Sequence, residues 1–299
     1  MVAHDLSEDA RLVSRASYER DGFLLVPHPV LPRSLLDDAD AAMDSVLQGD
    51  YQTGVAPRAV GWRPGDDHRR IRKIDEAHYS DRRILDLFRC AELARWAARV
   101  TGADTRPGGF VQVYGTQLLV KPAGGAASGN IGLHQDIQYW RRQWLPGGQA
   151  FTITIALSDV DADGGAITFF RGTHRWAGGD AHGVLPAHDG GGSTEGALGD
   201  FYSADVVGHR ERLAAVAAER GQQCEEVAAV LPRGGICIHD CRTFHGSGPN
   251  TGSTTRRSFA VHCRTDQAVP VPGSDDYYVS RLDEPLVAPI IFRAAAAKM

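Results

Sequence analysis

A short segment in the middle of the chain, GLHQDIQYW, carries two side chains that could bind one metal ion. His134 and Asp136 are two residues apart, and in an extended segment side chains at this spacing project from the same face. A third ligand must come from elsewhere, and His245, in the segment RTFHGSGPN, is the best candidate. Two histidines and one carboxylate on one side of an iron ion leave its opposite side open, which is the arrangement of non-haem Fe(II) oxygenases.

A second histidine is an alternative third ligand. An HxD triplet alone is a weak indication of a metal site, because such triplets often arise by chance. His239 lies six residues before His245 and could take the same place. It falls inside an apolar segment, GICIHD, rather than at its end, so we interpret His239 as a structural histidine near the site.

Arg256 could hold a carboxylate close to the metal. It begins the alternating segment RRSFAVHC, eleven residues after His245. If the turn GPNTGST brings the chain back as a neighbouring strand, Arg256 and His245 reach the same cavity. A guanidinium group binds a carboxylate through paired charge-assisted hydrogen bonds of roughly 1.5–3 kcal/mol each. Alternation sends Arg256 and Arg257 to opposite faces, so only one points inward; the alternative is that the arginine is a solvated surface charge.

The elements that must position these residues fall into two parts. The first hundred residues are read as helices around one strand, with the strand at 22–28 and helices at about 32–48 and 91–100. From about residue 110 the chain has short β-rich segments separated by Gly, Pro and Asp, which is typical of a sandwich or barrel. The predicted strands are 110–121, 131–138, 149–159, 166–170, 235–239 and 256–263.

The strand predicted at 149–159 has the clearest alternation. Phe151 and Ile153 fall on one face, while Thr152 and Thr154 fall on the other. We therefore expect one face to pack in the core and the other to line a cavity. Residues 177–208 show little periodicity and precede a predicted helix at 209–221; an insertion of that length is either a functional lid or a surface loop.

Composition excludes several classes of protein. The chain has 299 residues, 42% of them hydrophobic and 23% charged, and a formal net charge of -5, which fits a globular protein with a sizeable core. Nothing in this balance calls for nucleic acid or a membrane surface as a partner. The N-terminus has no signal-like apolar region, and no apolar run approaches the roughly 20 residues that cross a bilayer, so we expect a cytoplasmic protein. The five cysteines show no disulfide-like spacing.

Several spaced segments resemble one known family. They are YERDGFLLVP at 18–27, QLLVKP at 117–122, HQDIQYW at 134–140, DGGAITFFRGTHRW at 163–176 and HGSGPNTGSTTRR at 245–257. Taken in this order, they resemble the phytanoyl-CoA dioxygenase (PhyH) family of Fe(II)/2-oxoglutarate-dependent oxygenases. The resemblance implies a mainly β fold with flanking helices (α+β), built on a double-stranded β-helix, or jelly-roll, core.

We expect a single domain over residues 1–299. Within it, a helical part covers about 1–105 and the jelly-roll core about 106–270, with a lid-like insertion at about 177–225.

The resemblance also implies roles for individual residues. His134, Asp136 and His245 match the positions that bind iron, and Arg256 matches the residue that binds the distal carboxylate of 2-oxoglutarate. Further co-substrate contacts are implied for Gln117, Thr154 and Ser247.

The reaction implied is the hydroxylation of a small metabolite or natural product, with O2 consumed and succinate and CO2 released. Related halogenases carry Ala or Gly in place of the carboxylate, so Asp136 favours oxidation of the substrate over halogenation. Desaturation, epimerisation or cyclisation with the same cofactors is the first alternative. A catalytically silent jelly-roll protein that binds a metal such as Zn(II) is the second.

The substrate is the least constrained part of this prediction. Tyr139, Trp140 and Lys121 are the candidate substrate contacts, and the alternative is that the aromatic residues are ordinary packing. A small molecule is the only partner expected, and neither its identity nor the oligomeric state follows from the sequence.

Overall fold

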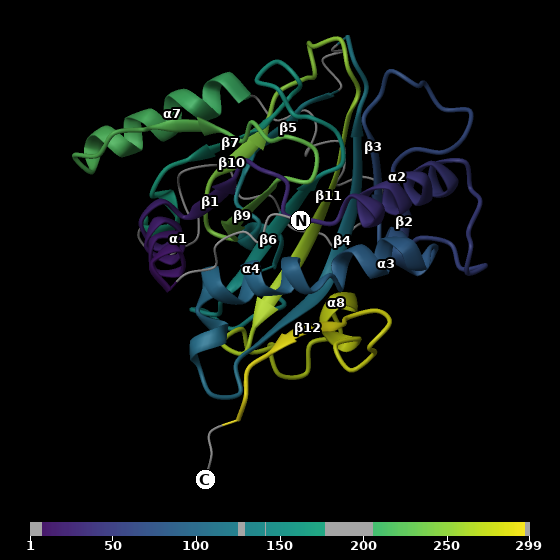
Figure 1. Cartoon of the computed structure of the whole chain (residues 1–299). Helices are drawn as coiled ribbons and strands as arrows, with labels where there is room; N and C mark the ends of the chain where they lie inside the picture. The colour runs from purple at the N-terminus through teal and green to yellow at the C-terminus, as the bar shows by residue number, and fades with distance from the viewer. Residues whose placement is uncertain (1–7, 125–128, 141, 177–205, 297–299) are drawn as a thin grey trace.

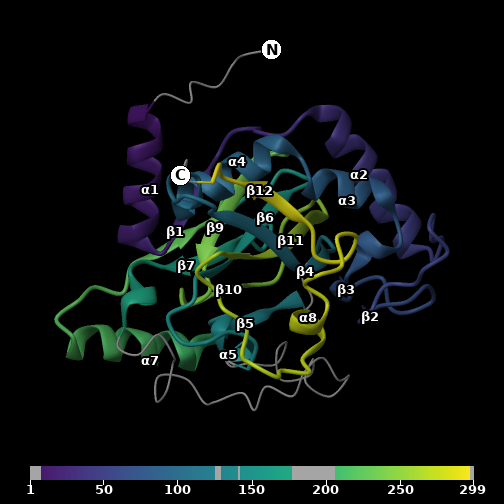
Figure 2. The same ribbon diagram turned by 90° about the horizontal axis from the view of Figure 1, so that it is seen from below.

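Two antiparallel sheets form the centre of the molecule (Figures 1 and 2). A computed structural model describes residues 8–124, 129–140, 142–176 and 206–296. The larger sheet has the order β1 (Phe23–Val26), β9 (Ile236–Asp240), β6 (Ala150–Ala156), β11 (Arg256–Thr265), β4 (Phe110–Lys121), β3 (Arg72–Asp75) and β2 (Ala59–Val60), with β12 (Ile290–Arg293) also paired to β4. The smaller sheet has the order β5 (Ile131–His134), β10 (His245–Ser247), β7 (Ile167–Phe170) and β8 (Glu226–Ala228).

Helices cover the outside of the two sheets. In Figure 2, α2, α3 and α4 lie over one face of the larger sheet, and β5 and β10 lie beyond its opposite face. No helix among the described residues is both long enough and apolar enough to cross a membrane. The helices are α1 (Glu8–Asp21), α2 (Arg33–Leu47), α3 (Arg82–Phe88), α4 (Ala91–Thr101), α5 (Ile137–Trp140), α7 (Val206–Glu219) and α8 (Tyr277–Ser280), with short 3-10 turns η1 (Ala77–Tyr79), η2 (Ala103–Thr105) and η4 (Thr173–Arg175).

The main hydrophobic core lies between the larger sheet and the helices α2, α3 and α4. Phe151 and Ile153 of β6 point into it, as does Phe259 of β11, and they join Met43 of α2 and Leu93 of α4 in one cluster. All five side chains have 0% of their surface exposed, and burying a side chain of this size contributes about 1.5–3 kcal/mol. Strand alternation leaves the other face of the larger sheet, which we call the inner face, free to carry polar side chains.

A second cluster holds α7 against the smaller sheet. Leu213 and Ala217 of α7 pack on Leu133, Phe170 and Phe244. The outer side of the smaller sheet is therefore closed by apolar contacts.

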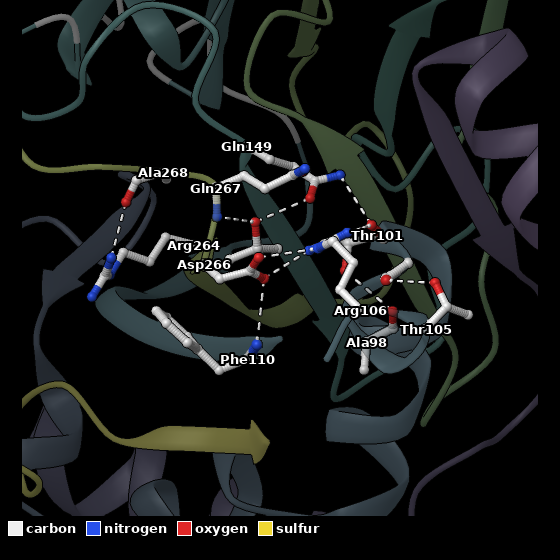
Figure 3. Close-up of polar contacts among 12 residues, drawn as sticks. Ala98, Thr101, Thr105, Arg106, Phe110, Gln149, Arg264, Asp266, Gln267 and Ala268 are labelled. Atoms are coloured by element: carbon white, nitrogen blue, oxygen red, sulfur yellow. Dashed lines mark hydrogen bonds and ion pairs between the residues drawn. The ribbon is translucent and has the colours of Figure 1, made fainter. Parts of the chain in front are cut away.

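One end of the larger sheet is tied to α4 by polar contacts (Figure 3). The Arg106 guanidinium group donates to the two carboxylate oxygens of Asp266 at 2.8 and 3.1 Å, and to the Thr101 carbonyl oxygen at 3.0 Å. Gln149 adds a hydrogen bond from its amide to the same carbonyl at 3.3 Å. These contacts fix the end of β11 that lies far along the strand from Arg256.

The elements differ from the predicted ones in informative places. The strand predicted at 131–138 ends at His134, and the chain then turns into α5. The first hundred residues contain β2 and β3 in addition to the one strand predicted. Of the predicted lid-like insertion, residues 177–205 lie outside the described residues. The lid therefore stays a prediction, as do the division of the chain into parts and the cytoplasmic location.

Glu76 is a buried carboxyl group next to β3. Its backbone is left-handed, with φ of 62°, and its side chain has 0% of its surface exposed. The Thr116 backbone N–H donates to Oε1 at 3.1 Å, and Oε2 lies 3.5 Å from Nδ1 of His78. Burial raises the pKa of Glu76 to about 8 and lowers the pKa of His78 to about 4, so both groups are neutral near pH 7.

We expect Glu76→Gln to make stability less dependent on pH. The folded protein keeps the Glu76 proton up to a pKa of about 8, whereas the unfolded chain loses it near 4.5, so wild-type stability falls as pH rises through that interval. The variant should be as stable as wild type near pH 4.5 and more stable than wild type near pH 8. The gain should be about 1.4 kcal/mol for each unit by which the pKa is raised. Denaturant unfolding measures both, and exposed Glu219→Gln is the control. The same stability difference at both limits would contradict the prediction.

Candidate metal centre

The three predicted ligands come together at the edge of the smaller sheet. His134 ends β5 and His245 begins β10, and the two residues face each other in the antiparallel pairing. Oδ1 of Asp136 lies 3.5 Å from Nε2 of His134 and 3.7 Å from Nε2 of His245. One donor atom from each residue lies within 4.8 Å of the others, and all three residues are buried.

Asp136 reaches the centre by a turn and not along a strand. β5 ends at His134, and the Asp136 carbonyl accepts a hydrogen bond from the Tyr139 N–H at 2.9 Å as α5 begins. The prediction that both side chains project from one strand face was wrong in this detail. The turn brings the carboxylate to the same place because only one residue separates it from the strand end.

Hydrogen bonds to the backbone set the proton positions of the two histidines. Nδ1 of His134 lies 2.8 Å from the Gly132 carbonyl oxygen, and Nδ1 of His245 lies 3.0 Å from that of Thr243. A carbonyl oxygen only accepts, so each Nδ1 carries the proton and each Nε2 presents a lone pair. Burial, followed by repulsion from His134 and His239, holds the pKa of His245 well below its usual value. The neutral imidazole is the form that binds a metal.

The second oxygen of Asp136 is held by two donors. The Thr152 hydroxyl donates to Oδ2 at 2.7 Å, and Nε2 of His239 lies 3.1 Å from the same oxygen. Burial opposes ionisation of Asp136, but the surrounding histidines, His245 first, hold its pKa well below the usual value. Oδ1 is therefore left for a metal. His239 supports the carboxylate from inside β9, in agreement with its interpretation as a structural histidine.

The donor set suits iron. Two imidazole nitrogens and one carboxylate oxygen are the ligands of the facial arrangement used by non-haem Fe(II) enzymes. Each ligand is oriented by a further hydrogen bond, a feature that keeps such ligands in place. The three residues thus fit the metal that their spacing predicted.

A pair of buried cations lies on the inner face, on the neighbouring strands β11 and β4. Arg256 of β11 is paired in register with Lys121 of β4, and the two side chains are 3% and 2% exposed. The ammonium group of Lys121 donates to Oγ of Ser247 at 2.6 Å and to the carbonyl oxygens of Ser247 and Gly248 at 3.2 and 2.7 Å. Arg256 donates to the Gly165 carbonyl oxygen.

Neither cation has a carboxylate partner among the described residues. Burial and then repulsion from Arg256 hold the pKa of Lys121 well below its usual value, and burial lowers the pKa of Arg256 to about 10. Two buried cations without an anion are unfavourable. The arrangement therefore fits an anionic ligand. Ser247 links it to the metal centre, because β10 starts at His245 and ends at Ser247.

The other predicted residues also lie on the inner face or at its edge. Thr154 is opposite Ala260 on one side and Cys237 on the other, and Gln117 is opposite Ala260 and Asp75. These positions are compatible with the co-substrate contacts that the resemblance implied, and the assignment of the two residues stays a prediction.

The three candidate substrate residues lie in different environments. The ring of Tyr139 lies 5.7 Å from that of His134. Trp140 is 6% exposed and packs on His262 at 4.9 Å and on Tyr114 at 5.4 Å between ring centroids. Lys121 lies beside Arg256, as described above. Tyr139 thus adjoins the metal ligands, and Trp140 belongs to the packed wall next to them.

Sequence reasoning missed several polar residues of the inner face. Thr152 was assigned to a cavity-lining face, but its contact with Asp136 was not foreseen. The buried pair of Lys73 and Asp75, with 3.1 Å between Nζ and Oδ1, lies on β3, a strand that was not predicted. His262 has the same inward alternation as Arg256, and that alternation is the signal that could have revealed it.

Comparison with known proteins identifies the family to which these residues belong. The model of the phytanoyl-CoA dioxygenase (PhyH) family matches residues 18–258. The chain belongs to this family. The match covers most of the chain, including the three candidate ligands and Arg256, and confirms the predicted family.

Two relatives of this PhyH-family chain are bacterial proteins named ectoine dioxygenase. The one from Streptomyces avermitilis is 25% identical over 170 residues, which are 53% of this chain and 50% of that protein. The one from Stutzerimonas stutzeri is 25% identical over 276 residues, which are 88% of this chain and 79% of that protein. The first match thus spans only half the length of the relative.

Solved structures share the fold of this PhyH-family chain. EctD from S. alaskensis with bound Fe has a TM-score of 0.65 at 17% identity, covering 98% of this chain and 88% of that one. The α-ketoglutarate-dependent carbocyclase SnoK from nogalamycin biosynthesis has 0.59 at 21%, covering 99% and 94%. The epimerase SnoN from the same biosynthesis has 0.57 at 18%, covering 98% and 97%. These likenesses confirm the predicted fold class.

Proposed function

We propose that this PhyH-family chain is an Fe(II)- and 2-oxoglutarate-dependent dioxygenase that hydroxylates a small-molecule substrate. One observation carries the proposal: Ser247, two residues after the ligand His245, contacts one of two paired buried cations that lack an anionic partner among the described residues. A dicarboxylate that binds the metal at one end and the cations at the other satisfies both features. A silent metal-binding protein would have no use for the buried cations.

His134, Asp136 and His245 would hold the iron. Once bound, Fe(II) with 2-oxoglutarate and O2 supplies the oxidation of the substrate, with succinate and CO2 as by-products. The protein orients the reactants and excludes water around them.

Arg256, Ser247 and Lys121 have different roles in binding 2-oxoglutarate. Ser247 accepts a hydrogen bond from Lys121, so its own hydroxyl proton is free to donate to a carboxylate. All three ammonium protons of Lys121 already have acceptors within 3.2 Å. We therefore assign Arg256 and Ser247 as the direct contacts of the distal carboxylate. Lys121 contributes charge and positions Ser247, in place of the substrate contact suggested for it from the sequence.

Of the oxidations that this cofactor set supports, we propose hydroxylation. Asp136 supplies a carboxylate ligand, which favours hydroxylation over halogenation. Epimerisation and cyclisation are the alternatives, since SnoN and SnoK share the fold and are named as an epimerase and a carbocyclase. Product analysis by mass spectrometry separates the outcomes, because hydroxylation adds one oxygen atom whereas epimerisation leaves the mass unchanged.

A spectroscopic titration tests the proposal without a known substrate. Anaerobic Fe(II) plus 2-oxoglutarate should give a weak visible charge-transfer band, and the same protein with Zn(II) should give none. Admission of O2 should then release succinate. A band that fails to appear at saturating Fe(II) and 2-oxoglutarate would overturn the proposed function.

A further inference from the structure

Four inner-face residues form one row across the larger sheet. Thr152 of β6 lies opposite His239 of β9 on one side and His262 of β11 on the other, and His262 lies opposite Gly115 of β4. The Thr152 hydroxyl oxygen is 2.7 Å from Oδ2 of Asp136 and 2.9 Å from Nδ1 of His262. One hydroxyl group thus joins the metal-binding carboxylate to a second histidine.

Counting protons along this contact assigns the tautomer of His262. The Thr152 hydroxyl donates its single proton to Oδ2 of Asp136. The Thr152 oxygen must then accept from His262, which places a proton on Nδ1. His262 is neutral, since burial lowers its pKa to about 4. Its Nε2 therefore carries a lone pair and no proton.

Nε2 of His262 is available to a ligand. It has no hydrogen-bond partner among the described residues. It also keeps some exposed surface, unlike the buried polar atoms that have neither a partner nor contact with solvent. His262 as a whole is 9% exposed. His262 therefore presents an unprotonated ring nitrogen that is not fully enclosed, and it is joined through the Thr152 hydroxyl to the metal ligand Asp136.

The surroundings of His262 are aromatic. A Cβ atom at position 115 would lie 3.3 Å from Cδ2 of His262 and 3.2 Å from Cε1 of Tyr278. The absence of a side chain at Gly115 therefore leaves room for both rings beside β4. Trp140 packs on the ring of His262 at 4.9 Å. Such walls favour a flat or apolar body, and Nε2 is the polar group set among them.

We propose that His262 is a specificity-determining residue that accepts a hydrogen bond from the substrate through Nε2, and that the Asp136–Thr152 pair locks it in this form. The substrate would then carry a hydroxyl or N–H donor close to the carbon that is oxidised. That a substrate binds here rests on the proposed function, but the tautomer of His262 can be measured without turnover.

The first experiment measures the tautomer by NMR. Protein with 15N-labelled histidine and Zn(II), a diamagnetic replacement for iron, is examined through two-bond 1H–15N correlations, with His262 assigned by the loss of its signals in His262→Gln. We expect a pyrrole-type Nδ1 and a pyridine-type Nε2. Thr152→Val should shift His262 towards the opposite tautomer, Thr152→Ser should restore it, and Thr154→Val, a matched change on the same strand face, should leave it unchanged. A pyridine-type Nδ1 in wild type would overturn the assignment.

The second experiment tests the acceptor with two matched probes, phenol and anisole, which differ in the presence of a hydrogen-bond donor. With Zn(II) and 2-oxoglutarate bound, phenol should move the Nε2 resonance of His262 upfield, and anisole should move it much less. Equal effects of the two compounds, including no effect of either, would overturn the proposal. Neither experiment needs turnover, so its failure is distinct from the missing charge-transfer band that would overturn the oxygenase function.

Discussion

Asp136→Ala and His245→Ala should each reduce succinate formation from 2-oxoglutarate by more than about 100-fold. Loss of a group that merely orients a metal ligand costs about 10–100-fold in metal affinity or activity, and these changes remove a ligand itself. Oδ1 of Asp136 lies within 3.7 Å of both histidine Nε2 atoms, so the alanine variant loses the only carboxylate of the set. Anaerobic Fe(II) titration and succinate release measure the effect.

His239→Ala provides the graded control for these variants. His239 contacts Oδ2 of Asp136 at 3.1 Å and is not part of the ligand set. Iron binding should therefore weaken by about 10–100-fold without being abolished. If His239→Ala lost all iron while His245→Ala kept wild-type turnover, the assignment of the third ligand would have to be exchanged between the two histidines.

The spacing of residues was enough to predict which side chains meet, because strands impose simple rules. Alternation with a period of two placed Arg256 and Arg257 on opposite faces of one strand. The structure agrees: Arg256 is 3% exposed, whereas Arg257 forms ion pairs with Asp40 and Asp44 of α2 at 2.8 and 2.7 Å. β4 begins and ends at the predicted residues, 110 and 121.

Contacts that depend on strand register could not be predicted in this way. Thr152 and His262 are more than a hundred residues apart in the chain, and they meet because β6 and β11 pair in one particular register. A shift of either strand by a single residue would send its side chain to the opposite face, away from its partner. The turn that carries Asp136 was missed for a related reason, since the apolar and aromatic residues after it suit a strand as well as a short helix. The charged strand β3 lacks the apolar run by which strands are recognised.

Arg256→Ala should raise the KM for 2-oxoglutarate by at least about 100-fold, because two charge-assisted hydrogen bonds of about 1.5–3 kcal/mol each are lost. Iron binding should stay close to wild type, since Arg256 is not one of the three residues of the ligand set. The variant would therefore retain the metal and lose the visible band at 2-oxoglutarate concentrations that saturate wild type. Steady-state kinetics and anaerobic titration measure the two effects separately.

Arg257→Ala is the matched control, because it removes the same guanidinium group from the next residue. Its ion pairs lie on the helix-covered face of the sheet and are partly exposed, so its loss should cost at most about 1 kcal/mol of stability and leave the KM for 2-oxoglutarate unchanged. An equal rise in KM for both variants would mean that disturbance of β11, and not loss of a carboxylate contact, explains the effect. A rise confined to Arg256→Ala would indicate that the inward guanidinium binds the co-substrate.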